Sequence, residues 1–255
     1  MAEPVLLLRL EGPMQSWGTR SRWDVRDTGL EPTKSGVIGL LGCAMGLKRD
    51  DTKLEELDKV LLFGVRIDRP GTIATDYHTV TGYHRTADGC YKHSGGVAKK
   101  LEEARKHGEY TIVSPRDYIY DASFLVALAV KSRYKDTDAD RLQEIESHLK
   151  NPKWPLYLGR KSCVPTRPIL DRLTYDYADI ESALRGEPCA TRDVTAQHRL
   201  PPNKDEDPNL PRQRLEAWIE CPDGEYERQD AMRLNPLRFY EFRRCRYIND
   251  IDTPV

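Results

Sequence analysis

The sequence predicts an α+β fold, namely a ferredoxin-like split βαβ sheet with helices on one face. Three observations lead to this prediction. Short apolar runs at residues 5–10, 61–68 and 117–130 have the composition of strands. Helical segments stand between these runs. The resulting order of strand, helix, strand, strand, helix, strand is that of the split βαβ unit.

The first strand, residues 5–10, is almost entirely apolar and ends in turn residues, which indicates a strand buried on both faces inside the sheet. The next helix begins near Lys34 and Ser35 and runs through the stretch GVIGLLGCAMG. Glycine lowers helix propensity, so its recurrence indicates a helix that packs closely on the sheet or admits a ligand at its start.

A short helix near residues 54–60 leads into the second strand at residues 61–68. Residues 76–114 then form a polar, glycine-bearing stretch with little apolar content. A segment of this kind adds little to a core, which favours a protruding binding element over a flexible insertion.

Residues 117–130 give the strongest strand pattern, because they alternate and then become fully apolar. The predicted elements after them are an amphipathic helix at 137–149, a helix at 179–184, a polar proline-rich loop at 201–211, and strands at 214–221 and 238–247. We therefore divide the chain into a ferredoxin-like domain, residues 1–150, and a smaller, irregular, β-rich C-terminal part, residues 151–255.

The charge balance excludes a protein drawn to nucleic acid by its overall field, since the net charge is −1 over 255 residues. Binding of nucleic acid must then come from local patches. Arginines cluster at Arg20, Arg22 and Arg26, and residues 238–246 interleave arginine with aromatic side chains. Taken alone, each such run is better explained as a solvated face, since charge runs usually mean only that.

The six cysteines are scattered, and no C-x-x-C pair occurs, so no zinc site is expected. Free thiols indicate a reducing, cytoplasmic setting. The apolar run at the N-terminus is interrupted by Arg9 and is too short for a signal peptide or a membrane span. We expect no metal, no cofactor and no membrane contact.

Motifs of nucleophilic, metal-dependent or dinucleotide-dependent enzymes are absent. The best acid/base candidate is His78, with Tyr77 beside it and His84 and Arg85 downstream. This set can in principle cleave RNA without a metal. However, adjacent residues on a strand point to opposite faces, so Tyr77 and His78 would not share a site there.

Phosphate binding has more support. If Lys34 and Ser35 begin the glycine-rich helix, its first amide groups and its dipole favour an anion there. The same sequence is equally explained if Ser35 is an ordinary N-cap of this helix and no ligand binds there. Gly159, Arg160 and Lys161 offer a second device, in which a glycine lets a phosphate approach two cations.

In their order along the chain, these stretches resemble the CasD family, the subunit of the type I-E CRISPR Cascade complex that holds the 5′ handle of the guide RNA, or crRNA. The matching motifs are LRLEGPMQSWG, PTKSGVIGLLG, KRDDT, DYHTV, RDYIYDASFLVAL and PLYLGRKSCVPTRPI. They cover about residues 5–170.

The resemblance implies a ferredoxin-like, RRM-related fold with a long hairpin thumb between about residues 83 and 116. It implies a non-catalytic, RNA-binding subunit that caps the filament of backbone subunits and helps to seat the large subunit, so that it meets target DNA only through the complex. A related branch in type I-C systems cleaves its own precursor. A metal-independent endoribonuclease that processes precursor crRNA with His78 and Tyr77 therefore stays open as the alternative.

The resemblance also assigns residues to the RNA. Arg116 stands at the thumb base, where it would insert among handle nucleotides. In the loop GPMQSWG, Gln15 can bond a base or phosphate and Trp17 can stack on a base, or else Trp17 plugs the base of the domain. The expected RNA-binding set is Gln15, Trp17, Lys34, Ser35, His78, His84, Arg85, Arg116, Arg160 and Lys161.

Overall fold

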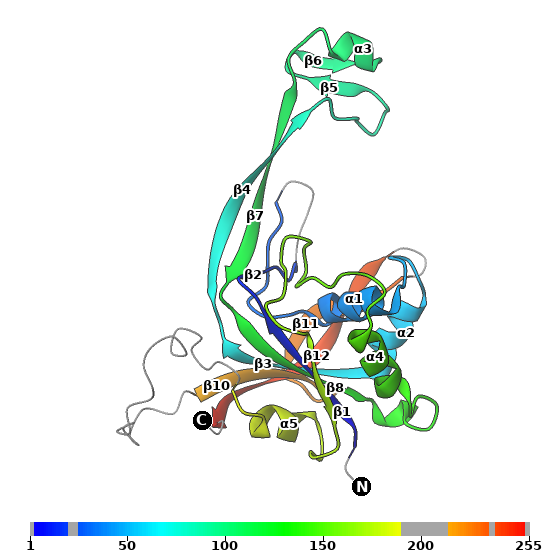
Figure 1. The fold of residues 1–255 in the computed structure, drawn as a ribbon, viewed down its shortest axis with the longest axis vertical. Helices are drawn as coiled ribbons and strands as arrows, with labels where there is room; N and C mark the ends of the chain where they lie inside the picture. Colours follow the sequence, from blue (N-terminus) through cyan, green and yellow to red (C-terminus); the bar gives the residue numbers. More distant parts are fainter. Residues whose placement is uncertain (1–2, 20–24, 190–213, 235–237, 253–255) are drawn as a thin grey trace, which may run out of the picture.

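A computed structural model describes residues 3–19, 25–189, 214–234 and 238–252. Its main feature is a seven-stranded sheet in the order β11-β12-β10-β3-β8-β1-β9 (Figure 1). Each neighbouring pair of strands in this sheet is antiparallel. The α+β fold predicted from the sequence is therefore confirmed.

The N-terminal elements form one half of this sheet and its helical cover. They are β1 (Val5–Glu11), α1 (Lys34–Met45), α2 (Lys53–Val60), β3 (Leu61–Arg69), β8 (Ser123–Val130), a 3₁₀ turn (Ser132–Tyr134), α4 (Arg141–Lys150) and β9 (Leu170–Thr174). The helices α1, α2 and α4 lie on the same side of the sheet (Figure 1). The strand order is β3-β8-β1-β9, with β8 between the two strands that α1 and α2 connect.

Strand β1 is buried on both faces, as its apolar run predicts, although it lies next to the edge strand β9 rather than in the middle of the sheet. Side chains alternate between the two faces of a strand. Leu6 and Leu8 accordingly join the core cluster under α1 and α4, whereas Val5 and Leu7 join a second cluster under α5 (Ile180–Gly186).

The C-terminal strands extend the same sheet. Strands β10 (Arg214–Glu220) and β12 (Phe239–Asp252) confirm the two predicted strands, and β11 (Tyr226–Arg233) was not predicted. Because β10 pairs with β3 and β9 pairs with β1, strand pairing crosses the boundary placed at residue 150. The division into two domains stays a prediction. The predicted loop at 201–211 lies outside the described residues.

A long arm leaves the body as a two-stranded ribbon of β4 (Thr72–Gly82) and β7 (Tyr110–Tyr120) (Figure 1). The short strand β2 (Met14–Gln15) pairs with its base. Its outer end carries β5 (Tyr91–His93), β6 (Gly96–Ala98) and the one-turn helix α3 (Leu101–Ala104). A protrusion is present, but it spans residues 72–120 rather than 83–116. The sequence of β4 lacks the apolar residues of a buried strand, because nearly all of its residues are exposed, and it therefore looks like a polar loop.

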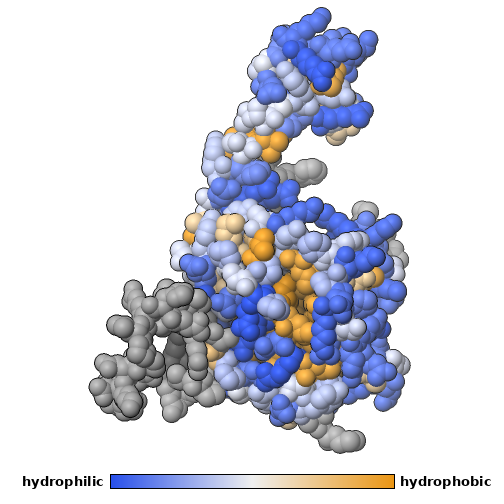
Figure 2. Space-filling view, in the orientation of Figure 1, coloured by the Kyte–Doolittle hydropathy of each residue, from blue (hydrophilic) through white to orange (hydrophobic). Residues whose placement is uncertain are grey.

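The surface differs between arm and body. Figure 2 shows a mostly hydrophilic outer end of the arm and a band of hydrophobic colour on the body. Within the described part of the chain, no helix has the length and apolar character needed to cross a membrane.

Candidate nucleic-acid interface

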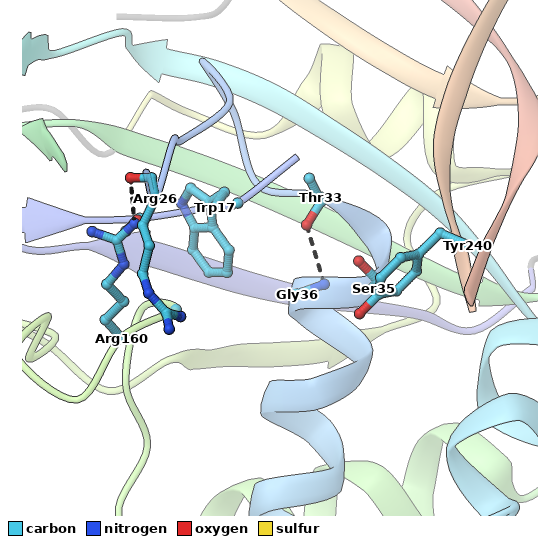
Figure 3. Close-up of a pocket in the computed structure, with 10 residues that line it drawn as sticks. Trp17, Arg26, Thr33, Ser35, Gly36, Arg160 and Tyr240 are labelled. Atoms are coloured by element: carbon cyan, nitrogen blue, oxygen red, sulfur yellow. Dashed lines mark hydrogen bonds between the residues drawn. The ribbon is translucent and has the colours of Figure 1, made fainter. Parts of the chain in front are cut away.

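A hollow of about 240 Å³ lies where the base of the arm meets the start of α1. It is lined by Ser16, Trp17, Gly18, Arg26, Thr33, Ser35, Gly36, Gly159, Arg160 and Tyr240. Figure 3 shows Arg26 and Arg160 on one side of the hollow, Ser35 and Tyr240 on the other, and Trp17 between them. The walls thus come from three parts of the chain that are far apart in the sequence, residues 16–36, 159–160 and 240.

Arg160 holds these segments together. Its guanidinium donates to the backbone oxygens of Asp117 (3.1 Å), Arg26 (2.8 Å) and Asp27 (3.3 Å), and it lies 4.7 Å from the centre of the Tyr118 ring. The preceding Gly159 has φ +94°, and a Cβ there would collide with the backbone oxygen of Ser16. Only glycine meets both conditions, so the Gly159–Arg160 pair fixes this wall of the hollow.

Arg26 and Arg116 meet at the arm base. The backbone of Arg26 accepts from the Asp117 amide (2.9 Å) and donates to the Pro115 oxygen (3.1 Å), so residues 25–26 form a bridge against β7. The side chain of Arg26 is exposed. Arg116 lies opposite Asp76 in the ribbon, and its Nε is buried without a hydrogen-bond partner.

Helix α1 begins at Lys34, as predicted, but its N-cap is Thr33 and not Ser35. The Thr33 hydroxyl accepts from the Gly36 amide at 3.2 Å. The Lys34 amide donates to Asp230 Oδ2 at 2.7 Å. The amide of Ser35 takes part in neither bond, and its side chain lines the hollow.

The predicted phosphate contact of Lys34 is wrong, because the side chain is 1% exposed and points into the protein. Its Nζ donates to the Asp58 backbone oxygen (2.7 Å) and to Glu220 Oε2 (2.8 Å). Burial lowers the pKa of the Lys34 ammonium, and the nearby carboxylates oppose that shift. The lysine joins α1 to β10 instead of meeting a ligand.

The predicted RNA contacts of Gln15 and Trp17 are also wrong. Gln15 is fully buried, and its Nε2 donates to the oxygens of Leu10 (3.0 Å) and Ala122 (2.9 Å). Its Oε1 accepts from Trp17 Nε1 at 3.0 Å. Trp17 is 1% exposed and belongs to the core, which agrees with the alternative that it plugs the base of the domain. A Cβ on Gly36 would come within 2.8 Å of its ring, so this glycine lets α1 pack there.

The other candidates lie along the arm or beside the hollow. His78 is half-buried on β4, and the neighbouring Tyr77 is 70% exposed. His84 and Arg85 follow the end of β4, where His84 Nε2 lies 3.0 Å from the Val80 oxygen, so both are separated from the hollow by the length of the ribbon. Lys161 is exposed next to Arg160. Of the predicted set, Trp17, Ser35 and Arg160 line the hollow, Arg116 forms a bridge with Arg26 beside it, and Lys161 follows Arg160 in the chain.

Among the lining residues absent from the predicted RNA-binding set, Arg26 is the one cation and Tyr240 the one aromatic residue. Both belong to patches visible in the sequence, the arginines at 20–26 and the arginine–aromatic run at 238–246. No local sequence pattern places these runs at the hollow. Strand β12 comes close to α1 only because it is paired into the large sheet.

The family model described as CRISPR-associated protein (Cas_Cas5) matches residues 5–237. This chain belongs to the Cas5 family of CRISPR-associated proteins. Among curated relatives, it is 36% identical over 173 residues to the CRISPR system Cascade subunit CasD of Escherichia coli (strain K12), an alignment that covers 64% of this chain and 68% of the relative. The predicted resemblance to the CasD family is confirmed.

Two solved structures extend the likeness over nearly the whole chain. A chain of a CRISPR RNA-guided surveillance complex is 30% identical with a TM-score of 0.69, covering 96% of this Cas5 chain and 90% of the other. A crystal structure of a Cas protein is 30% identical with a TM-score of 0.59, covering 97% and 95% of the two chains. The C-terminal strands, where the sequence resemblance fades, are therefore part of the common fold.

The described residues contain no group of three or more His, Cys, Asp or Glu side chains that could hold a metal ion. The chemistry available at the hollow is that of cations, a hydroxyl group, an aromatic ring and glycine backbone. This set suits a phosphodiester chain, which needs charge and close backbone approach.

Proposed function

We propose that this Cas5 protein is a non-catalytic subunit of a type I-E Cascade complex that binds the 5′ handle of the crRNA. It caps the filament of backbone subunits, helps to seat the large subunit, needs no cofactor and acts in the cytoplasm. One observation carries the proposal: the hollow at the arm base gathers Arg26, Arg160 and Ser35 around exposed glycine backbone in a chain of net charge −1.

The hollow suits a ribose-phosphate backbone. Arg26 is exposed and its backbone is fixed by β7, so its guanidinium can pair with a phosphate without disturbing the fold. The Arg160 guanidinium donates its hydrogen bonds to backbone carbonyl oxygens, and its positive charge lies beside the hollow. Gly18 and Gly159 line the hollow with backbone alone, which presents no side chain to the RNA.

The arm would continue this surface. In the register of the ribbon, Asp76 lies opposite Arg116 and His78 lies opposite Ser114. Residues two apart on a strand share a face, so Arg116 and His78 share one face of the arm and Tyr77 lies on the other. We assign the face with Arg116 and His78 to the RNA, with His84 and Arg85 as its outermost contacts.

The strand order supports an RRM-related unit. Elements β1, α1, β3, β8, α4 and β9 follow the split βαβ order along the chain, and their strands lie in the order β3-β8-β1-β9. We infer that this is the ferredoxin-like RNA-binding domain. In this proposal, the arm is an insertion between its second and third strands, and residues 151–255 supply its last strand and the added β-rich part.

The alternative function, metal-independent processing of precursor crRNA, needs Tyr77 and His78 at one site. They are consecutive residues of β4 and lie on opposite faces of the ribbon, which speaks against the pair. Incubation of the purified protein with a repeat-containing transcript in EDTA tests it. We expect intact transcript, and cleavage that is lost in His78→Ala would support the nuclease instead.

The main test is co-expression with the backbone subunits, the large subunit and a crRNA, followed by purification through this chain. We expect the wild type to retain guide-length RNA and the Arg26→Ala, Lys161→Ala double variant to retain much less of it. Lys150→Ala, an exposed lysine at the end of α4, is the matched control. Equal RNA in all three preparations would contradict the proposed site, and a protein scaffold without RNA contact would then fit better.

A further inference from the structure

Strand β12 begins with three exposed aromatic residues, of which the first, Phe239, is 44% exposed and the other two, Tyr240 and Phe242, border hollows. Tyr240 is 37% exposed and Phe242 is 63% exposed. The charged residues next to Tyr240 and Phe242 form ion pairs within the protein. Glu241 pairs with Arg233 Nε at 2.8 Å, and Arg243 pairs with Asp230 at 2.6 Å. The two rings are thus left at the surface while the charged residues between and beside them are bound within the protein.

The two rings border adjacent hollows. Tyr240 lines the hollow at the start of α1, and Phe242 lines a second hollow of about 590 Å³. Thr33 lines both hollows, so they lie side by side along β12. In the first hollow, Tyr240 stands across from Arg26 and Arg160 (Figure 3). A nucleotide there can place its phosphate on the arginines and its base on the ring.

The spacing fits separated bases. Tyr240 pairs with Met232 and Phe242 with Gln229, on either side of a register shift between β11 and β12, and Cα atoms two residues apart on a strand lie about 6.6 Å apart. Stacked nucleotides rise only about 3.4 Å, so the two rings would each receive one base of an unstacked pair. Aromatic platforms of this kind bind single strands with little regard to sequence, because every base has a flat face.

The polar surroundings favour RNA over a protein partner. The second hollow contains Arg228, which lies 4.0 Å from the centre of the Trp218 ring and is paired with the buried Glu31. The buried Asp230 there is neutralised by Arg243. Protein interfaces are also enriched in aromatic residues and arginine, but Tyr240 shares its hollow with Arg26 and Arg160, the two cations proposed to hold the RNA backbone, which favours RNA.

We propose that Tyr240 and Phe242 form a stacking platform for two consecutive, unstacked bases of the single-stranded RNA whose backbone lies at Arg26 and Arg160. This proposal rests on the proposed function and deepens it, since it names the residues that hold the bases. It also gives the β-rich C-terminal strands a direct part in binding.

The test uses the full chain and synthetic single-stranded RNAs of about ten nucleotides, a length within the usual site sizes, each with one 2-aminopurine at a successive position. Stacking quenches this base, so the wild type should quench it at two adjacent positions. Tyr240→Ala should restore fluorescence at one position and Phe242→Ala at the other. Each change should weaken binding by about tenfold. Tyr240→Phe and Phe242→Tyr should behave as the wild type.

Salt titration separates this proposal from the proposed function. The alanine variants at 240 and 242 should keep the wild-type salt slope, whereas Arg26→Ala should reduce it by about 0.7. Salt-dependent binding that is unchanged in both aromatic variants, without a change in quenching, would overturn the platform and leave the proposed function standing. No RNA binding by the wild type would remove both.

The assembled complex provides a second measurement. If Tyr240→Ala or Phe242→Ala retained RNA but lost the backbone or the large subunit on purification, the aromatic surface would be a protein interface and the platform would be wrong. Thermal unfolding of each variant checks that the fold is intact. Both rings are exposed, so the unfolding midpoint should stay close to that of the wild type.

Discussion

Gln15 and Lys34 illustrate how a polar side chain can serve the fold rather than a ligand. Each is buried, and each directs its donors at backbone oxygens from another part of the chain. Gln15 joins the end of β1 to the turn before β8 and orients Trp17. The side chains that remain available at the hollow are those of Arg26, Ser35 and Tyr240.

Replacing Gln15 by alanine tests this structural role. Gln15→Ala leaves the oxygens of Leu10 and Ala122 and the Trp17 Nε1 without their partner. Buried groups that lose a partner cost about 1–3 kcal/mol each, so we expect a loss of about 3 kcal/mol in the free energy of unfolding. Urea unfolding measures it, with Lys161→Ala as an exposed control. A change below about 0.5 kcal/mol, the range of surface substitutions, would contradict the burial.

Cys245 gives a second prediction for a single residue. It is fully buried, and burial raises the pKa of its thiol to about 11. At pH 8 such a group is thiolate in about one part per thousand, and the thiolate is the reactive form. We expect no labelling of Cys245 by iodoacetamide in the native protein and full labelling in urea, mapped by mass spectrometry. Native labelling at a rate comparable with the half-buried Cys43 would be inconsistent with this placement.

Among the elements, the arm differs most from the rest. Neither core cluster contains a residue between Thr72 and Asp117, and the ribbon is held to the body through β2, residues 25–26 and Arg160 at its base. A two-stranded ribbon is marginally stable by itself, so the anchoring at its base is what fixes its direction.

Shortening the arm tests its independence from the core. Gly82 and Tyr110 are a cross-strand pair, so an Asn-Gly turn can replace residues 83–109. We expect the free energy of unfolding to change by less than about 1 kcal/mol, since no residue of the core clusters is removed. Guide RNA retention in the co-purified complex should fall. Loss of the folded state, seen by circular dichroism, would show that the outer end contributes to the core.

For the whole molecule, electrostatics must act locally. The net charge is −1, and many cations are consumed by ion pairs within the protein, as at Lys34–Glu220, Arg66–Asp68 and Arg243–Asp230. At the arm base, the cations that line the hollow are Arg26 and Arg160. Binding should therefore depend on salt through only a few phosphates.

The salt slope measures that number. With roughly four or five phosphates neutralised, the slope of log K against log salt for a single-stranded handle RNA should be near −3, at about 0.7 per contact. Fluorescence anisotropy at several salt concentrations gives the value. Arg26→Ala should bring it closer to zero, and Lys59→Ala, an exposed lysine paired with Glu55 on α2, should not. A slope of zero for the wild type would contradict the patch.

The sequence by itself determined the family, the α+β class, the buried first strand, the start of α1 and the existence of a protrusion. The family came from the order of the matching motifs, whereas the other features follow from local composition and periodicity, which fix how a segment folds and which of its faces is apolar. Only the tertiary structure decided which polar residues are free. Lys34 and Ser35 are neighbours in one motif, yet the helix turns the first into the protein and the second toward the hollow.

The tertiary structure also decided the place of Tyr240, which the sequence did not predict at the hollow. Tyr240 reaches the start of α1 because β12 pairs with β10 and β10 with β3. Pairing between distant strands depends on the packing of the whole sheet, and no short pattern records it.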